Sequence, residues 1–208
     1  MYNIILDDKA RLEYDEVIKE LELISPEIMN RKSSRANVQQ AFCFQTIREL
    51  VTKDQDILCV GSFEDTAFEA LKRNGYQCIG IDPAGGGKKI TLEEFAQSDQ
   101  QFDCSFACSV IEHVVDHMNF IDIMCKTIKP KGLMILTCDY KESYIVGDPN
   151  NPTTSFRMYN NDTLSEIRKL LSNNNLELVD EPNWKGEMDF TWEGHWYAFA
   201  TIVARKYE

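Results

Sequence analysis

The chain has 208 residues and a formal net charge of −12, because its 34 acidic side chains outnumber its 22 basic ones. This length suits a single hydrophobic core, so we expect residues 1–208 to form one domain. A hydrophobic fraction of 43% is typical of a globular protein and argues against a disordered chain. The acidic balance and the lack of a basic stripe argue against nucleic acid as a partner.

The seven cysteines are scattered along the sequence, and no two of them form a Cys-x-x-Cys pair. Their number is odd, and no apolar run is long enough to cross a bilayer. The sequence also starts without a signal-peptide pattern. These features predict a cytoplasmic protein with no membrane partner. Cys104 and Cys108 lie four residues apart on an expected strand, so we expect both to pack in the core on one face.

The first 52 residues have the pattern of two helices that cover the rest of the domain. Apolar side chains recur at the spacing of one helix face over residues 8–24. Ser25 and Pro26 then end this helix. A second helix with one apolar stripe is expected over residues 35–52.

From residue 56 onward, short apolar segments alternate with helical ones. This alternation, with short connections, is typical of a doubly wound α/β sheet. Helices are expected over residues 65–74 and 116–128. Strands are expected over residues 57–60, 78–81, 102–108 and 133–137, with a further short strand near Ile90.

The last third of the chain completes an α/β core that we assign to residues 53–208. A long polar loop over residues 139–161 is interpreted as the substrate loop. Thr163 and Glu166 have the spacing of a capping box, which predicts that a helix begins there. Two further strands are expected over residues 176–179 and 196–204, joined by an aromatic segment.

Two residues at expected strand ends suit a nucleoside ligand. Ligands of open parallel sheets bind outside the carboxyl ends of the strands. Gly61 follows the first expected strand, and Asp82 follows the second. The carboxylate can accept hydrogen bonds from ribose hydroxyls, while the glycine lets a ligand approach the backbone. Alternatively, Asp82 only begins a turn before Pro83.

Two common nucleotide-binding motifs are absent. Phe63 stands where a Gly-x-Gly-x-x-Gly loop needs its second glycine, which argues against a nicotinamide cofactor. Gly87 and Lys88 match the end of a Walker loop, but Lys89 replaces the hydroxyl residue that this loop needs. The glycine run before Lys88 therefore predicts a flexible turn.

Four stretches resemble, in order and at ordinary spacing, the motifs of class I S-adenosylmethionine-dependent methyltransferases. They are residues 56–64, 80–83, 102–114 and 128–137. The resemblance implies a Rossmann-like, doubly wound sheet of seven strands, mostly parallel with an antiparallel last strand. It also implies S-adenosylmethionine as the cofactor. The chain departs from the family pattern where Cys59 replaces an acidic residue and Phe63 replaces a glycine.

The resemblance also implies which residues contact the cofactor. The loop after the first strand would meet the methionine part, Asp82 the ribose, and residues near Thr91 the adenine. Arg35 or Gln45 either contacts the methionine carboxylate or lies on the surface. The expected cofactor-binding residues are Gly61, Ser62, Phe63, Asp82, Pro83, Thr91, Leu92, Ser109 and Val110.

Methyl transfer to a hydroxyl needs an acceptor held in line with the methyl carbon, and it benefits from removal of the hydroxyl proton. His113, Asp139 and His195 are the candidate bases. His113 either takes this proton or only caps its loop. No ligand spacing marks a metal site, so none is predicted.

The short chain favours a small acceptor. Tyr140, Tyr144 and Arg157 lie in the expected substrate loop and are the candidate substrate-binding residues. Arg157 either clamps an anionic group through its planar fork or forms an ordinary salt bridge. Aromatic side chains at Trp184, Trp192, Trp196 and Tyr197 either stack on a ring of the acceptor or fill the core.

The resulting hypothesis is O-methylation of a small, sugar-related or surface-glycan precursor, anionic or linked to a sugar, which would belong to carbohydrate biosynthesis. One alternative is a non-catalytic methyltransferase-like protein that binds S-adenosylmethionine. Another is a nicotinamide or nucleotide-sugar enzyme on a related sheet, which the missing glycine motif disfavours. The oligomeric state is left open.

Overall fold

The structure, a computed structural model, describes residues 1–31, 33–145, 157–192 and 194–207. Most of the expected substrate loop, residues 146–156, lies outside the described residues. Within the described ranges, no helix combines the length and the apolar character needed to cross a bilayer.

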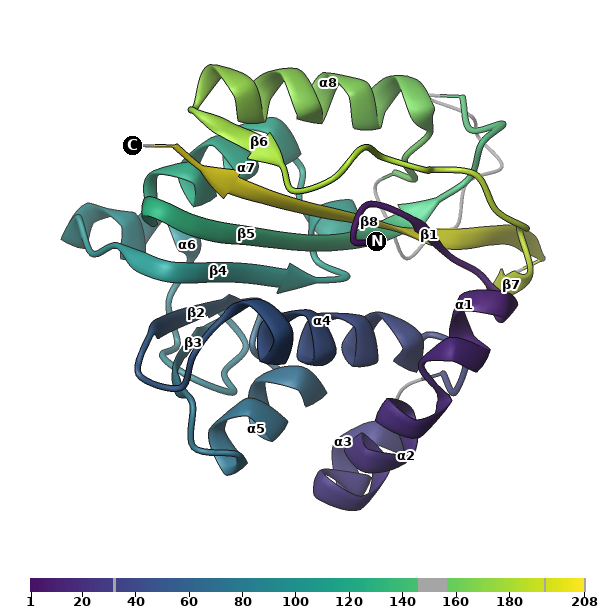
Figure 1. The fold of residues 1–208 in the computed structure, drawn as a ribbon, viewed down its shortest axis with the longest axis horizontal. Helices are drawn as coiled ribbons and strands as arrows, with labels where there is room; N and C mark the ends of the chain where they lie inside the picture. Colours follow the sequence, from purple (N-terminus) through teal and green to yellow (C-terminus); the bar gives the residue numbers. More distant parts are fainter. Residues whose placement is uncertain (32, 146–156, 193, 208) are drawn as a thin grey trace.

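An eight-stranded sheet runs through the molecule in the order β1-β8-β5-β4-β2-β3, and β6 and β7 also pair with β8 (Figure 1). Strands β3, β2, β4 and β5 are parallel, whereas β8 is antiparallel to β5. The strands are β1 (Ile5–Leu6), β2 (Asp56–Val60), β3 (Gln77–Ile81), β4 (Phe102–Cys108), β5 (Ile128–Tyr140), β6 (Leu176–Leu178), β7 (Phe190–Trp192) and β8 (His195–Lys206).

This topology confirms the predicted fold class, with eight strands instead of seven. Two short strands that were not expected, β1 and β7, form against β8, and the strand expected near Ile90 does not form. Strand β1 pairs with Phe199 and Ala200, while β6 pairs further along the same strand from Ala204 to Lys206.

Helices cover both faces of the sheet, with α4 and α5 on one side and α7 and α8 on the other (Figure 1). Strand β2 is buried against both layers, since Ile57 and Cys59 face the first and Leu58 and Val60 the second. The helices are α1 (Asp8–Glu13), α2 (Asp15–Ile24), α3 (Pro26–Met29), α4 (Asn37–Leu50), α5 (Thr66–Arg73), α6 (Leu92–Phe95), α7 (His117–Lys126) and α8 (Asn161–Asn173).

The expected helix over residues 8–24 is two helices in the structure. The chain leaves helical geometry at Tyr14, whose φ and ψ are −93° and 3°. The ring of Tyr14 packs edge-on against Phe42 of α4, with 6.0 Å between the ring centroids. The break therefore lets α2 turn its buried Ile18 and Leu21 into the core shared with α4.

Two further expectations, a strand near Ile90 and the start of the helix near Thr163, were wrong. No strand forms near Ile90. Instead, a single bridge joins Ile81 to Lys88, and the short helix α6 follows. Helix α8 begins earlier than predicted, because Asn160 is its cap and exchanges hydrogen bonds with Thr163. Cys104 and Cys108 pack in one core beneath α4 and α5, as predicted.

Candidate active site

A pocket of about 200 Å³ lies at the carboxyl ends of β2 and β3 and beside the segment that follows β4. Its walls are mainly apolar, and Asp82, Thr91 and Glu93 are the lining residues with polar side chains. The lining residues are Val60, Gly61, Ile81, Asp82, Pro83, Ile90, Thr91, Leu92, Glu93, Val110, Val114 and Phe120. Most of the expected cofactor residues are therefore brought together, whereas Ser62, Phe63 and Ser109 are not among the described residues that line this pocket.

Asp82 is held by two backbone donors. Its Oδ1 accepts a hydrogen bond from Ala84 N–H at 2.6 Å, and its Oδ2 accepts one from Phe63 N–H at 3.4 Å. Each carboxylate oxygen has a second acceptor position, so the side chain can still bind a ligand hydroxyl. Asp82 thus begins a turn, as the alternative interpretation from sequence expects, and it also lines the pocket.

Two features require glycine at position 61, namely its backbone conformation and the proximity of Val110. The φ of Gly61 is +84°, a left-handed conformation that side chains rarely adopt. A Cβ atom placed there would lie only 2.4 Å from Cγ2 of Val110. Strand β2 and the segment after β4 therefore meet through this glycine. The backbone itself forms the pocket wall between them.

The two residues after Gly61, Ser62 and Phe63, stabilise the loop through hydrogen bonds. Ser62 is buried and its hydroxyl donates to the carbonyl of Gly85 at 3.4 Å. Phe63 is 48% exposed, and its N–H holds Asp82 as described above. Their predicted contacts with the methionine part of the cofactor stay predictions.

The opposite wall begins with Thr91, which caps α6. Its hydroxyl accepts from Glu94 N–H at 3.2 Å, and its own N–H donates to the Glu94 carboxylate at 3.0 Å. This reciprocal cap fixes Thr91 at the pocket and turns the apolar side chain of Leu92 inward.

Ser109 adopts a left-handed conformation, with φ at +57°, and its hydroxyl donates to Oε1 of Glu112 at 2.7 Å. Glu112 is completely buried, and burial raises the pKa of its carboxyl above the usual value. No described residue forms a hydrogen bond with its Oε2. The family resemblance implied a cofactor contact for Ser109, whereas Glu112 was not predicted as a site residue. The available signal was an acidic residue inside an apolar turn.

The three candidate bases come from three separate segments. His113 is exposed in a single 3-10 turn (Ile111–His113), whereas Asp139 is 6% exposed near the end of β5. His195 is half-buried at the start of β8, opposite Trp192. None of them is among the described residues that line the pocket. Their role in catalysis stays a prediction. Among the described residues, no three His, Cys, Asp or Glu side chains converge as metal ligands.

The candidate substrate-binding residues are mostly buried. Tyr140 is 1% exposed, its hydroxyl donates to the carbonyl of Trp184 at 3.2 Å, and burial raises its pKa to about 12. Tyr144 is also buried, and its carbonyl accepts from the Asn160 side chain at 3.0 Å. Both side chains therefore pack in the protein. Their contact with a substrate stays a prediction.

Among the described residues, the partners of Arg157 are backbone carbonyls, and its contact with an anionic acceptor stays a prediction. Its guanidinium donates to the backbone carbonyls of Val114 and Val115, the latter at 2.7 Å, with a longer contact of 3.5 Å to Ile111. The side chain therefore binds the segment that carries one wall of the pocket.

The aromatic residues of the C-terminal part separate into two groups. Trp184 and Tyr197 are buried, which matches the core alternative. Trp192 and Trp196 lie on the β7–β8 hairpin and are 45% and 57% exposed. This second group is available for contact with a ligand.

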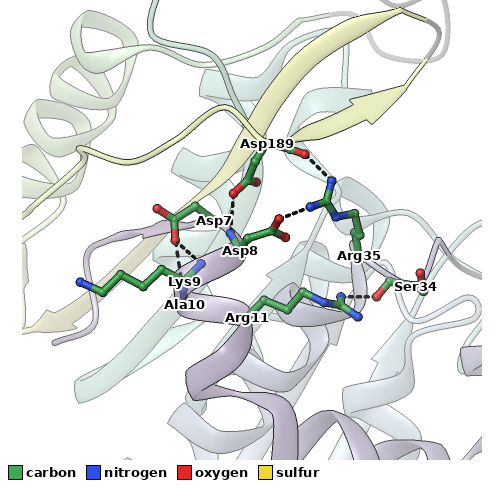
Figure 2. Close-up of polar contacts among 8 residues, drawn as sticks. All are labelled: Asp7, Asp8, Lys9, Ala10, Arg11, Ser34, Arg35 and Asp189. Atoms are coloured by element: carbon green, nitrogen blue, oxygen red, sulfur yellow. Dashed lines mark hydrogen bonds and ion pairs between the residues drawn. The ribbon is translucent and has the colours of Figure 1, made fainter.

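Arg35 belongs to a junction of charged groups away from the pocket lining, shown in Figure 2. Its guanidinium donates to the carboxylate of Asp8 and to the carbonyl of Asp189. Asp8 N–H in turn donates to the Asp189 carboxylate at 2.6 Å. Burial, and then the charges of Asp8 and Asp7, raise the pKa of Asp189. Gln45 donates to Glu49 on its own helix.

The family model described as a methyltransferase domain matches residues 34–181 of this chain. The chain belongs to the class I S-adenosylmethionine-dependent methyltransferases. Enzymes of this class use S-adenosylmethionine as the methyl donor.

Relatives and solved structures agree with this assignment. The ubiquinone biosynthesis O-methyltransferase of Rickettsia bellii is 30% identical over 139 residues, which cover 59% of this chain and 56% of that protein. The human mitochondrial ubiquinone biosynthesis O-methyltransferase is 31% identical over 114 residues, covering 44% and 31% of the two chains. The match thus spans about half or less of these relatives.

Among solved structures, the 1,6-didemethyltoxoflavin N1-methyltransferase of Burkholderia thailandensis aligns with a TM-score of 0.60 at 12% identity, covering 94% of this chain and 90% of that one. Magnesium protoporphyrin IX methyltransferase from Synechocystis PCC 6803 aligns with a TM-score of 0.57 at 13% identity, covering 83% and 84%. At this identity the likeness concerns the fold.

The pocket residues fit the adenosine part of S-adenosylmethionine. The apolar side chains of Ile90, Leu92 and Val110 suit a flat ring, and Asp82 suits ribose hydroxyls. The missing side chain at Gly61 leaves backbone where a Cβ would collide with the facing wall.

Proposed function

We propose that this chain transfers a methyl group from S-adenosylmethionine to an oxygen atom of a small acceptor. The observation that carries the proposal is the pocket beside Gly61 and Asp82, which lies where a class I sheet binds its cofactor. The names of the relatives, which are O-methyltransferases, support oxygen as the accepting atom.

The cofactor supplies an electrophilic methyl group when bound, and the chain's own residues do the rest. Asp82 and the wall of Val110 and Leu92 hold the adenosine part in place. The acceptor must then lie in line with the methyl carbon, and this alignment supplies much of the rate enhancement. His113, Asp139 or His195 would take the hydroxyl proton during transfer.

The acceptor class has two candidates. The sugar-related or glycan-precursor acceptor remains the prediction from sequence. The names of the relatives favour a second candidate, a phenolic precursor of a quinone. Exposed Trp192 and Trp196 suit stacking on either kind of ring. We also propose a cytoplasmic setting, which the seven cysteines without disulfides support.

Titration calorimetry with S-adenosylhomocysteine tests the cofactor site. We expect Asp82→Asn to weaken binding about tenfold, because two hydrogen bonds to a charged acceptor become weaker. Asp99→Asn is the matched control, since Asp99 lies in an exposed turn after α6. If the wild-type chain binds no S-adenosylhomocysteine, or if both variants bind equally, the proposal fails.

Mass spectrometry tests the reaction itself. Purified protein would be incubated with S-adenosylmethionine and a panel of sugars and phenols, and methylated products would be sought with the matching demethylated cofactor. Binding without turnover across the panel would favour the alternative of a non-catalytic binding protein. Turnover of phenols but not sugars would decide between the two acceptor classes.

A further inference from the structure

One wall of the pocket is a short segment whose backbone carbonyls need outside donors. Val110 and Val114 line the pocket, and a single 3-10 turn lies between them. This turn has few backbone hydrogen bonds of its own, from His113 N–H to the Val110 carbonyl at 2.9 Å and from Val114 N–H to Ile111 at 3.4 Å. Such a turn depends on its neighbours to stay in one conformation.

The donors come from the C-terminal part of the expected substrate loop. The two terminal nitrogens of Arg157 bind different carbonyls, Nη1 that of Val114 and Nη2 that of Val115. A planar guanidinium can hold two carbonyls in a fixed geometry, which a lysine ammonium does not impose. Arg157 therefore fixes the end of the segment that presents Val114 to the pocket.

Tyr159 adds a second attachment to the same segment. Its hydroxyl donates to the Ile111 carbonyl at 3.2 Å and lies 3.0 Å from Nδ1 of His117. Because a phenol has one proton, the hydroxyl that donates to Ile111 accepts from His117. The backbone of Tyr159 is itself anchored, since its N–H donates to the Asp139 carbonyl at 2.9 Å. The carbonyl-binding pair of Arg157 and Tyr159 thus rests on the end of β5.

We propose that Arg157 is a positioning residue for the cofactor: it holds the segment from Val110 to Val115 in the position that forms one wall of the adenosine pocket. The inference rests on the proposed function, because it assumes that this pocket binds S-adenosylmethionine. It assigns Arg157 to the cofactor wall and not to an anionic acceptor.

Calorimetry with S-adenosylhomocysteine on Arg157→Ala and Arg157→Lys tests this role. We expect Arg157→Ala to weaken binding about tenfold, in line with the loss of two hydrogen bonds. Arg157→Lys should recover part of that affinity, because an ammonium can still donate to one carbonyl. Arg168→Ala is the control, since Arg168 is an exposed arginine on α8 that pairs with exposed Glu181. It should bind like the wild type.

Hydrogen exchange without ligand provides the second readout. In Arg157→Ala, amides of residues 110–117 should exchange faster, while those of β2 keep their protection. Arg157→Lys, with its smaller change, serves for this readout if the alanine variant does not fold. Unchanged affinity in a folded Arg157→Ala, or a loss of protection throughout the sheet, would overturn the inference. If the wild type itself binds no S-adenosylhomocysteine, the proposed function fails. The exchange result then still reports whether Arg157 holds the segment.

Discussion

The side of the molecule that we propose binds the cofactor and the side that we propose meets the acceptor are built in different ways. The pocket lies at the ends of neighbouring parallel strands, and Gly61 and Asp82, which directly follow β2 and β3, are among its lining residues. On the proposed acceptor side, contacts join side chains from distant parts of the chain. Asp8 and Arg35 meet Asp189 (Figure 2). Arg157 reaches the segment after β4.

This difference has a physical reason. Parallel strands bring their carboxyl ends to one edge of the sheet, so short loops there are adjacent before any side chain is chosen. On the acceptor side, β1 and β7 are short, and within the described part of the chain they pair with β8 alone. Side-chain contacts must therefore hold this side. We expect the cofactor side to respond most strongly to backbone changes and the acceptor side to the loss of polar contacts.

The largest effect should come from adding a methyl group at Gly61. In Gly61→Ala the new Cβ would approach Cγ2 of Val110, a stiff branched side chain that must shift. Together with the left-handed backbone, we expect a loss of about 2–4 kcal/mol in stability and about 100-fold in S-adenosylhomocysteine affinity. Chemical denaturation and calorimetry measure the two losses.

Gly75→Ala is the matched control for that change. Gly75 has a nearly identical φ of +82°, but a Cβ there would meet no atom within 4 Å. It should lose only about 1–2 kcal/mol of stability and keep its affinity, because backbone strain is its only cost. Equal affinities for the two variants would show that close packing at Gly61 does not shape the pocket.

The central strands and the pocket could be predicted from sequence because their signals are local. An apolar run such as residues 57–60 marks a buried parallel strand, and Asp82 directly follows another. Thr91 and Leu92 were expected at the cofactor only from the family resemblance, and both line the pocket. The family resemblance added the topology beyond β5.

What could not be predicted depends on contacts between distant residues. The two-residue strand β1 exists because Asn3 places its side chain against Val203 and Asp180, some 180 to 200 positions away. Arg35 had two open interpretations, and only the folded chain brings it to Asp8 and Asp189. Glu112 stands out in the sequence as an acidic residue inside an apolar turn, but its burial follows from the turn that Ser109 makes in the folded chain.

An intermediate effect should come from the cap of α8, on the acceptor side. The Asn160 side chain accepts from Thr163 N–H at 2.9 Å and donates to the Tyr144 carbonyl at 3.0 Å. Asn160→Ala should therefore cost about 1–2 kcal/mol in the free energy of unfolding. Glu166→Ala removes the exposed residue that sequence analysis placed in the cap and should stay within about 0.5 kcal/mol of wild type. Denaturant titration compares the two variants. A larger loss of stability in Glu166→Ala than in Asn160→Ala would instead support the cap predicted from sequence.

The smallest effect is a pH dependence located between the two sides, at His117. Burial, and then the charge of Arg157, lower its pKa to about 4 in the folded protein. An unfolded histidine titrates near pH 6.5, so between those values the unfolded chain binds more protons. Stability from this group is therefore fully present above about pH 6.5 and falls as the pH drops toward about 4. Because His117 is half-exposed, solvent screening should limit the loss to on the order of 1 kcal/mol.

Urea titrations of wild type and His117→Asn between pH 8 and pH 4 test this dependence. The difference in unfolding free energy between the two proteins should be constant above about pH 7 and should shift in favour of the variant as the pH falls, because asparagine takes up no proton. Tyr159→Phe provides the companion variant, since it removes the hydroxyl at 3.0 Å from Nδ1 and keeps the ring packed edge-on against the imidazole. A difference in unfolding free energy that stays constant down to pH 4 would show that protonation of His117 does not affect stability. The contacts of Arg157 with the pocket wall should then be independent of pH over the same range.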